Sequence, residues 1–118
     1  QIKSYILPLM DGTRHECYAI TEPESGSEIH VDTSADKVEN GYRINGEKWF
    51  VTGANHADFF FIQAKAFDGK ENLGDALFFL DMETEGIELV RTPLFSHTFD
   101  SHHPIYKFND VFIPQKNL

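Results

Sequence analysis

Short apolar stretches separated by turn-forming residues are the feature of this sequence that most restricts its fold. From residue 16 onward the apolar and aromatic residues come in short runs, several of them alternating with polar residues, and no helical segment lies between them. Such runs are typical of strands. They occupy residues 16–21, 42–45, 48–52, 59–63, 76–80, 87–90 and 105–113. We therefore expect a mainly β fold, an antiparallel β-barrel or a flattened sandwich.

Turn-forming residues divide these runs. Asn and Gly both tolerate positive φ angles, which tight turns require. We expect Asn40-Gly41 to begin a strand and Asn45-Gly46 to close a hairpin between the second and third runs. The polar residues 68–72 should form a loop between two aromatic strands.

The first eleven residues have a different pattern. Ile2, Tyr5, Ile6 and Leu9 lie at helical spacing. We expect residues 1–11 to be a short helical segment, the end of a preceding helical domain, and residues 1–118 to form a single domain. At this length the chain can bury one modest core.

Charge and cysteine content exclude several classes of protein. A net charge of −9 with ten Lys and Arg residues argues against binding nucleic acid or an anionic membrane surface. An anionic nucleotide remains possible, because backbone amides and hydroxyls can hold phosphates. Cys17 is the only cysteine and lies in an apolar run, so we expect it to be packed and not reactive. No signal peptide or membrane span is visible, and we expect a cytoplasmic protein.

Two stretches carry groups that could bind a ligand. Residues 21–28 combine hydroxyls with Pro23 and Gly26, so they could grip a polar ring edge or a phosphate, although an acidic surface turn has the same composition. Residues 46–54 contain an aromatic pair followed by Thr52, which could stack on a planar ligand and bond its edge; a core strand ending in a turn is the alternative.

These stretches resemble motifs of the acyl-CoA dehydrogenase family. Residues 17–28 resemble its A-x-T-E-P-x-x-G-S-D signature, and residues 46–58 resemble its G-x-K-x-W-I-T-N-G-x-x-A-D strand. Residues 108–114 resemble its F-x-D-V-x-V-P ending. The three motifs have the family's order and spacing and cover nearly the whole chain. The resemblance identifies the chain with the family's middle domain, a β-barrel.

The resemblance implies FAD as cofactor and acyl-CoA as substrate. The residues that it assigns to the flavin are Tyr18, Ala19, Ile20, Thr21, Phe50, Val51 and Thr52. The residues that it assigns to the substrate are Ser27, Ser101 and His103. In the family, a hydride passes from the substrate β-carbon to flavin N5 while a carboxylate removes the α-proton.

The resemblance also implies what lies outside this chain. The family places its catalytic base in a helical domain, so we expect no catalytic residue here, and we expect the isolated domain to be inactive and to hold FAD weakly or not at all. The parent enzyme would be a homo-oligomer, a dimer or tetramer, that passes electrons to an acceptor such as an electron-transfer flavoprotein.

The chain departs from the family pattern at several positions. Phe50 replaces the usual Trp, and Glu24 and Glu28 add negative charge near the first motif. A histidine-rich segment at 96–104 replaces a G-x-R-x-S-x-T stretch; its histidines lack the spacing of a metal site, and we expect no metal. Two alternatives stay open: a related flavin monooxygenase or nitroalkane oxidase, and a non-enzymatic β-sandwich interaction module.

Overall fold

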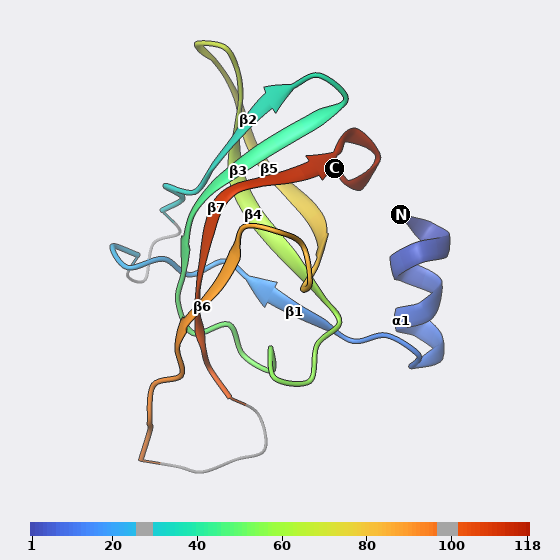
Figure 1. The fold of residues 1–118 in the computed structure, drawn as a ribbon, viewed down its shortest axis with the longest axis vertical. Helices are drawn as coiled ribbons and strands as arrows, with labels where there is room; N and C mark the ends of the chain where they lie inside the picture. Colours follow the sequence, from blue (N-terminus) through green and yellow to red (C-terminus); the bar gives the residue numbers. More distant parts are fainter. Residues whose placement is uncertain (26–29, 97–101) are drawn as a thin grey trace.

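The chain forms a curled, mainly β sheet with a short helix beside it (Figure 1). A computed structural model describes residues 1–25, 30–96 and 102–118. The elements are η1 (Ile2–Ile6), α1 (Leu7–Asp11), β1 (Glu16–Ala19), β2 (Ser34–Val38), β3 (Gly41–Lys48), β4 (Phe59–Asp68), β5 (Glu71–Asp81), β6 (Ile87–Arg91), β7 (Ile105–Pro114) and η2 (Gln115–Asn117). The predicted mainly β fold and the short N-terminal helical segment are both confirmed.

The sheet is mixed. Its strands follow the order β1-β4-β2-β3-β7-β6, and β5 also pairs with β4. β1 pairs with the first part of β4, β2 pairs with its last part, and β5 pairs along its whole length. β4 runs parallel to β1 and to β2, whereas the other pairings between described strands are antiparallel. The expected antiparallel arrangement is therefore corrected at β4. The long connection from β1 to β4 allows a parallel pairing, which a tight hairpin cannot form.

The turn at Asn45-Gly46 was predicted wrongly. β3 continues through these residues with a bulge between Ile44 and Gly46, and Asn45 Oδ1 accepts a hydrogen bond from Asp110 N at 2.8 Å. Asn45 therefore ties β3 to β7 instead of closing a hairpin. Residues 49–52, expected as part of a strand, lie beyond the end of β3.

The hairpin lies earlier in the chain, between β2 and β3. Asn40 has a φ of 66° in its turn, and Gly41 begins β3, as predicted. β2 itself was missed, because its exposed Asp36 and Lys37 conceal a strand whose one fully buried side chain is Ala35. The predicted loop at 68–72 is shorter than expected, because β5 already begins at Glu71.

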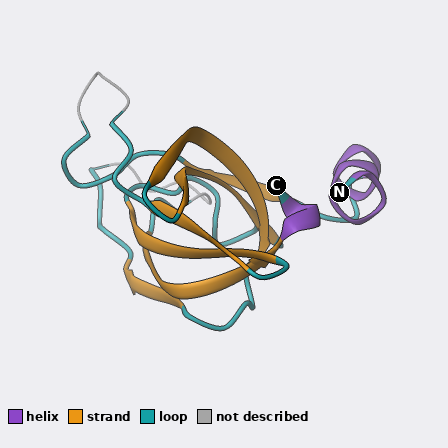
Figure 2. Cartoon of the chain, turned by 90° about the horizontal axis from the view of Figure 1, so that it is seen from above, coloured by secondary structure: helices purple, strands orange, loops and turns teal. Residues whose placement is uncertain are grey.

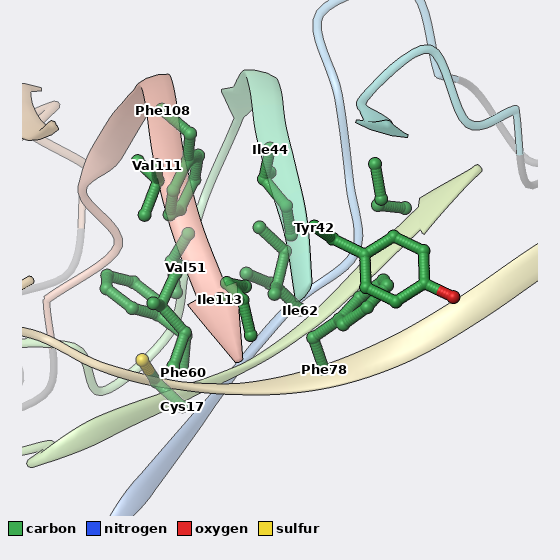
Figure 3. Close-up of a cluster of buried hydrophobic side chains, with 14 of the residues drawn as sticks. Cys17, Tyr42, Ile44, Val51, Phe60, Ile62, Phe78, Phe108, Val111 and Ile113 are labelled. Carbon is green, nitrogen blue, oxygen red and sulfur yellow. The ribbon is translucent and has the colours of Figure 1, made fainter. Parts of the chain in front are cut away.

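The hydrophobic core lies inside the curl, between the β3–β7 part of the sheet and the β4–β5 part (Figure 3). It includes Tyr42, Ile44, Phe60, Ile62, Phe78, Phe108, Val111 and Ile113. Cys17 is 2% exposed within it, and burial raises the pKa of its thiol to about 12. The cysteine is packed, as predicted, and its raised pKa disfavours the thiolate, which is the reactive form.

The N-terminal helix packs on the outside of the sheet, next to the C-terminal turn (Figure 2). The Tyr5 ring stacks on Phe79 at 4.9 Å between centroids, and its hydroxyl accepts a hydrogen bond from Asn117 Nδ2 at 3.0 Å. Arg14 lies over the Tyr5 ring and forms an ion pair with Asp81. The helix is thus attached by one buried aromatic ring, and its assignment to a preceding domain stays a prediction.

Candidate functional site

The two predicted ligand-binding stretches lie side by side in the fold. Trp49 N, just after β3, donates a hydrogen bond to Thr21 O, just after β1, at 2.8 Å. The two residues that form this bond are 28 positions apart in the sequence. The tertiary structure therefore brings together the two stretches that contain the seven residues predicted to bind the flavin.

Within the first stretch, strand alternation decides which side chains can reach a ligand. In β1, Cys17 and Ala19 point into the core, and Tyr18 points outward and is 45% exposed. Ile20 and Thr21 are half-buried. Tyr18 can therefore offer a ring face and Thr21 a hydroxyl, whereas Ala19 can contact a ligand only through its backbone.

The second stretch presents an aromatic ring in an unusual backbone conformation. Phe50 has a φ of 60°, which is rare for a residue with a side chain, and its ring is 43% exposed. Its edge meets the rings of Trp49 and Phe95 at 5.6 and 5.8 Å between centroids. The next residue, Val51, is 1% exposed and donates its N–H to Pro104 O at 2.9 Å, so its side chain belongs to the core.

The hydroxyl of Thr52 meets the imidazole of His103. Thr52 Oγ1 lies 2.9 Å from His103 Nδ1, and Gly53 N donates to His102 O at 2.9 Å. The ring of Phe95 packs edge-on against His103 at 5.2 Å. The structure thus brings together Thr52, predicted to bind the flavin, and His103, predicted to bind the substrate. Ser27 and Ser101 lie outside the described residues.

A buried ion pair between Glu22 and Lys48 joins the two stretches, and it was not predicted from the sequence. Lys48 Nζ lies 2.6 Å from Glu22 Oε1, and the side chains are 0% and 4% exposed. Lys48 also donates to Ile20 O at 3.0 Å. Glu22 accepts hydrogen bonds from the backbone N–H groups of Asp32 and Thr33 at 2.6 and 3.1 Å. The available signal was that the T-E-P motif contains a glutamate, here Glu22, and the G-x-K-x-W motif a lysine, here Lys48.

These contacts decide the ionisation of Glu22. Burial alone would raise the pKa of its carboxyl, but the hydrogen bonds from Lys48, Thr33 and Asp32 and the positive charge of Lys48 outweigh burial and lower that pKa. Burial lowers the pKa of Lys48, and Glu22 opposes the shift. The 2.6 Å contact is typical of a charge-assisted hydrogen bond. The pair joins the backbone after β1 to the end of β3.

The lowered pKa of Glu22 makes part of the stability acid-sensitive. Above the usual value near 4.5 the contribution of the carboxylate is complete, and it is lost as the pH falls through the lower pKa of the folded state. We expect Glu22→Gln to reduce the dependence of unfolding free energy on pH in this acidic range, measured by urea unfolding at several pH values. Glu24→Gln removes an exposed carboxylate nearby and should keep the wild-type dependence. Equal slopes in all three proteins would contradict this account of Glu22.

The described part of the chain holds neither a cluster of metal-ligating side chains nor a helix that could cross a membrane. Among residues 1–25, 30–96 and 102–118, no group of three His, Cys, Asp or Glu side chains could hold a metal ion. His97 and Asp100 of the histidine-rich segment lie outside these ranges. No described helix is long and apolar enough to cross a membrane.

Comparison with known proteins gives consistent matches. Residues 17–111 match the family described as acyl-CoA dehydrogenase, middle domain. An L-prolyl-[peptidyl-carrier protein] dehydrogenase from Serratia is 36% identical over 94% of this chain and 29% of its own length. The FAD complex of PigA has a TM-score of 0.87 and 32% identity over 98% of this chain and 30% of that chain. Butyryl-CoA dehydrogenase from Megasphaera elsdenii has a TM-score of 0.87 and 28% identity, with the same coverage. This chain thus spans less than a third of each of these proteins.

Proposed function

The chain belongs to the acyl-CoA dehydrogenase family as a middle domain, and we propose that it forms one wall of a site for FAD and an acyl thioester in a longer oxidoreductase. The observation that carries the proposal is the hydrogen bond from Trp49 N to Thr21 O. This bond joins the segment that carries Thr21 to the segment that carries Phe50 and Thr52, so groups from both predicted stretches can reach one ligand.

These residues fit a flavin ring chemically. The ring is planar and apolar on its faces and polar along its edge, so it favours exposed aromatic side chains beside hydroxyls and backbone amides. Tyr18 and Phe50 supply the aromatic surface, and Thr21 and Thr52 supply the hydroxyls. Ala19 and Val51 would contribute only backbone groups. PigA, part of which has the same fold, forms a complex with FAD, which supports the choice of ligand.

The proposed reaction is α,β-dehydrogenation of the acyl thioester. FAD, when bound, supplies the acceptor for the hydride that leaves the substrate. The residues of this chain hold and orient the ring, and Ser27, Ser101 and His103 are proposed to contact the thioester substrate. The carboxylate that removes the α-proton would come from the part of the enzyme beyond these 118 residues. An electron-transfer flavoprotein as acceptor and a homo-oligomeric enzyme belong to the same proposal.

The remaining alternatives differ in substrate or in chemistry. A flavin monooxygenase or nitroalkane oxidase would use the same wall, and the products that the longer enzyme forms distinguish it from a dehydrogenase. The non-enzymatic alternative required the motif resemblance to be coincidental, whereas the family match extends over residues 17–111.

Removal of the Thr21 hydroxyl tests the flavin site directly. We expect Thr21→Val, in the longer enzyme that contains this chain, to weaken FAD binding by about 2- to 10-fold, because one hydrogen bond contributes about 0.5–1.5 kcal/mol. The measurement is the dissociation constant of FAD, obtained by equilibrium dialysis and flavin absorbance.

A matched control is available at the other end of the fold. Thr13 is exposed and bonds its hydroxyl to Asp11 after the N-terminal helix, so Thr13→Val removes a hydroxyl outside the proposed site. FAD affinity should not change in this variant. An unchanged affinity in Thr21→Val, or a wild-type enzyme that binds no flavin, would exclude Thr21 from a flavin site.

A further inference from the structure

We propose that His103 is a positioning residue that orients the hydroxyl of Thr52 toward the flavin. The inference rests on the proposed function and deepens it, since it gives His103 a role on the cofactor side of the site beside the substrate contact proposed above. The observation behind it is the 2.9 Å distance from Thr52 Oγ1 to His103 Nδ1, between residues 51 positions apart in the sequence.

The backbone holds the two residues in register. Val51 N donates to Pro104 O, and Gly53 N donates to His102 O, each at 2.9 Å. Thr52 and His103 therefore lie between two backbone hydrogen bonds that join the segment after β3 to the segment before β7. The two backbone bonds keep the Cα atoms of Thr52 and His103 close together, so their side chains can stay in contact although Thr52 is exposed.

Aromatic packing restricts the imidazole ring. Phe95 meets His103 edge-on, with an interplanar angle of 86°, and Phe95 in turn contacts Phe50 at 5.8 Å between centroids. The ring that orients Thr52 and the ring proposed to face the flavin thus share a neighbour. Movement of His103 would disturb both Thr52 and Phe50.

The chemistry of the contact explains why it would matter. A threonine hydroxyl has one proton to donate, and two acceptor atoms lie near that of Thr52: Phe50 O at 3.4 Å and the closer Nδ1 of His103. Whichever of the two groups donates, the bond to His103 uses one hydrogen-bonding direction of the hydroxyl and fixes the others. A hydroxyl fixed before the ligand arrives loses less entropy when it binds.

Two substitutions at position 103 separate the polar contact from packing. His103→Phe keeps a ring against Phe95 and removes Nδ1, and we expect FAD to bind about 2- to 10-fold more weakly, the effect of one hydrogen bond. His103→Asn retains a polar atom near the position of Nδ1 and should restore most of the affinity. His102→Phe makes the same change at the exposed neighbouring side chain and serves as the control.

The experiment uses the longer enzyme that contains this chain and has three readouts. They are the dissociation constant of FAD, the absorbance spectrum of the bound flavin and the thermal unfolding midpoint. We expect His103→Phe to change the first two and to leave the midpoint near that of His102→Phe. Thr52→Val should weaken FAD binding at least as much. The double variant Thr52→Val/His103→Phe should bind FAD no more weakly than Thr52→Val alone, because His103 acts through the hydroxyl that Thr52→Val removes.

Additive losses in the double variant, or His103→Phe equal to wild type in both flavin readouts, would overturn the assignment of His103. An equal effect of His102→Phe would overturn it as well. A wild-type enzyme that binds no flavin would instead overturn the proposed function, so the two failures are distinguishable.

Discussion

Replacement of Lys48 by Met should lower the free energy of unfolding by about 3–5 kcal/mol, the cost of leaving one partner of a buried ion pair without the other. The side chain of Lys48 is fully buried, and Glu22 is 4% exposed. In the variant the Glu22 carboxylate would keep only its backbone donors, those of Asp32 and Thr33. Urea unfolding at neutral pH, followed by far-ultraviolet circular dichroism, measures the loss.

A second variant tests whether charge is the cause. Glu22→Gln/Lys48→Met removes both charges, so its loss of stability should be smaller than the sum of the losses in the two single variants. Lys37→Met is the matched control, because Lys37 forms an ion pair with Asp68 at 2.5 Å in which both side chains are about half exposed. Exposed pairs contribute little, so this control should unfold much like the wild type. Equal losses in Lys37→Met and Lys48→Met would contradict the role of burial.

Replacement of Gly46 by Ala should destabilise the fold by about 2–3 kcal/mol, in the upper part of the range for overpacked interiors. A Cβ atom at Gly46 would lie 2.4 Å from Thr33 Oγ1 and 2.8 Å from Thr33 Cα. Thr33 cannot easily move away, because its N–H donates to Glu22 and its carbonyl accepts from Lys65 N at 2.8 Å. The clash would therefore also disturb the buried ion pair.

Gly69→Asn provides the comparison for this second prediction. Gly69 lies in the β4–β5 turn with a φ of 59° and no atom within 4 Å of a Cβ placed there, and Asn tolerates this conformation. We expect a change within about 0.5 kcal/mol, although the added side chain is larger than that of Ala. If Gly46→Ala unfolds at the same urea concentration as Gly69→Asn, the close approach of β3 to Thr33 is not a constraint on the fold.

Family motifs identified the edge of the sheet that carries the candidate site, but not its internal contacts. The T-E-P stretch and the K-W-F-V-T stretch could be located in the sequence, but only the structure shows that they lie side by side. Ala19 and Val51 were grouped with the ligand-facing residues, yet both side chains are buried. Alternation along a strand separates such neighbours only when the strand's orientation in the sheet is known.

The bulge in β3 shows where local patterns reach their limit. Asn45-Gly46 has the composition of a tight turn, and only the pairing with β7, which resumes at Gly46 and runs to Lys48, shows that the strand continues. Similarly, the polar composition of β2 did not predict a strand. Its pairing with β3 and β4 supplies the stability that its own composition lacks.

By itself, the sequence determined the mainly β class, the N-terminal helical segment and the family, because strand-forming runs, turn residues and motifs are local properties of the chain. The tertiary structure alone decided the parallel pairing of β4, the Glu22–Lys48 pair and the contact between Thr52 and His103. These contacts join residues 26 and 51 positions apart in the two side-chain pairs, and periodicity along the chain carries no information about which distant residues meet. The edge proposed to bind flavin exists only where those distant segments come together.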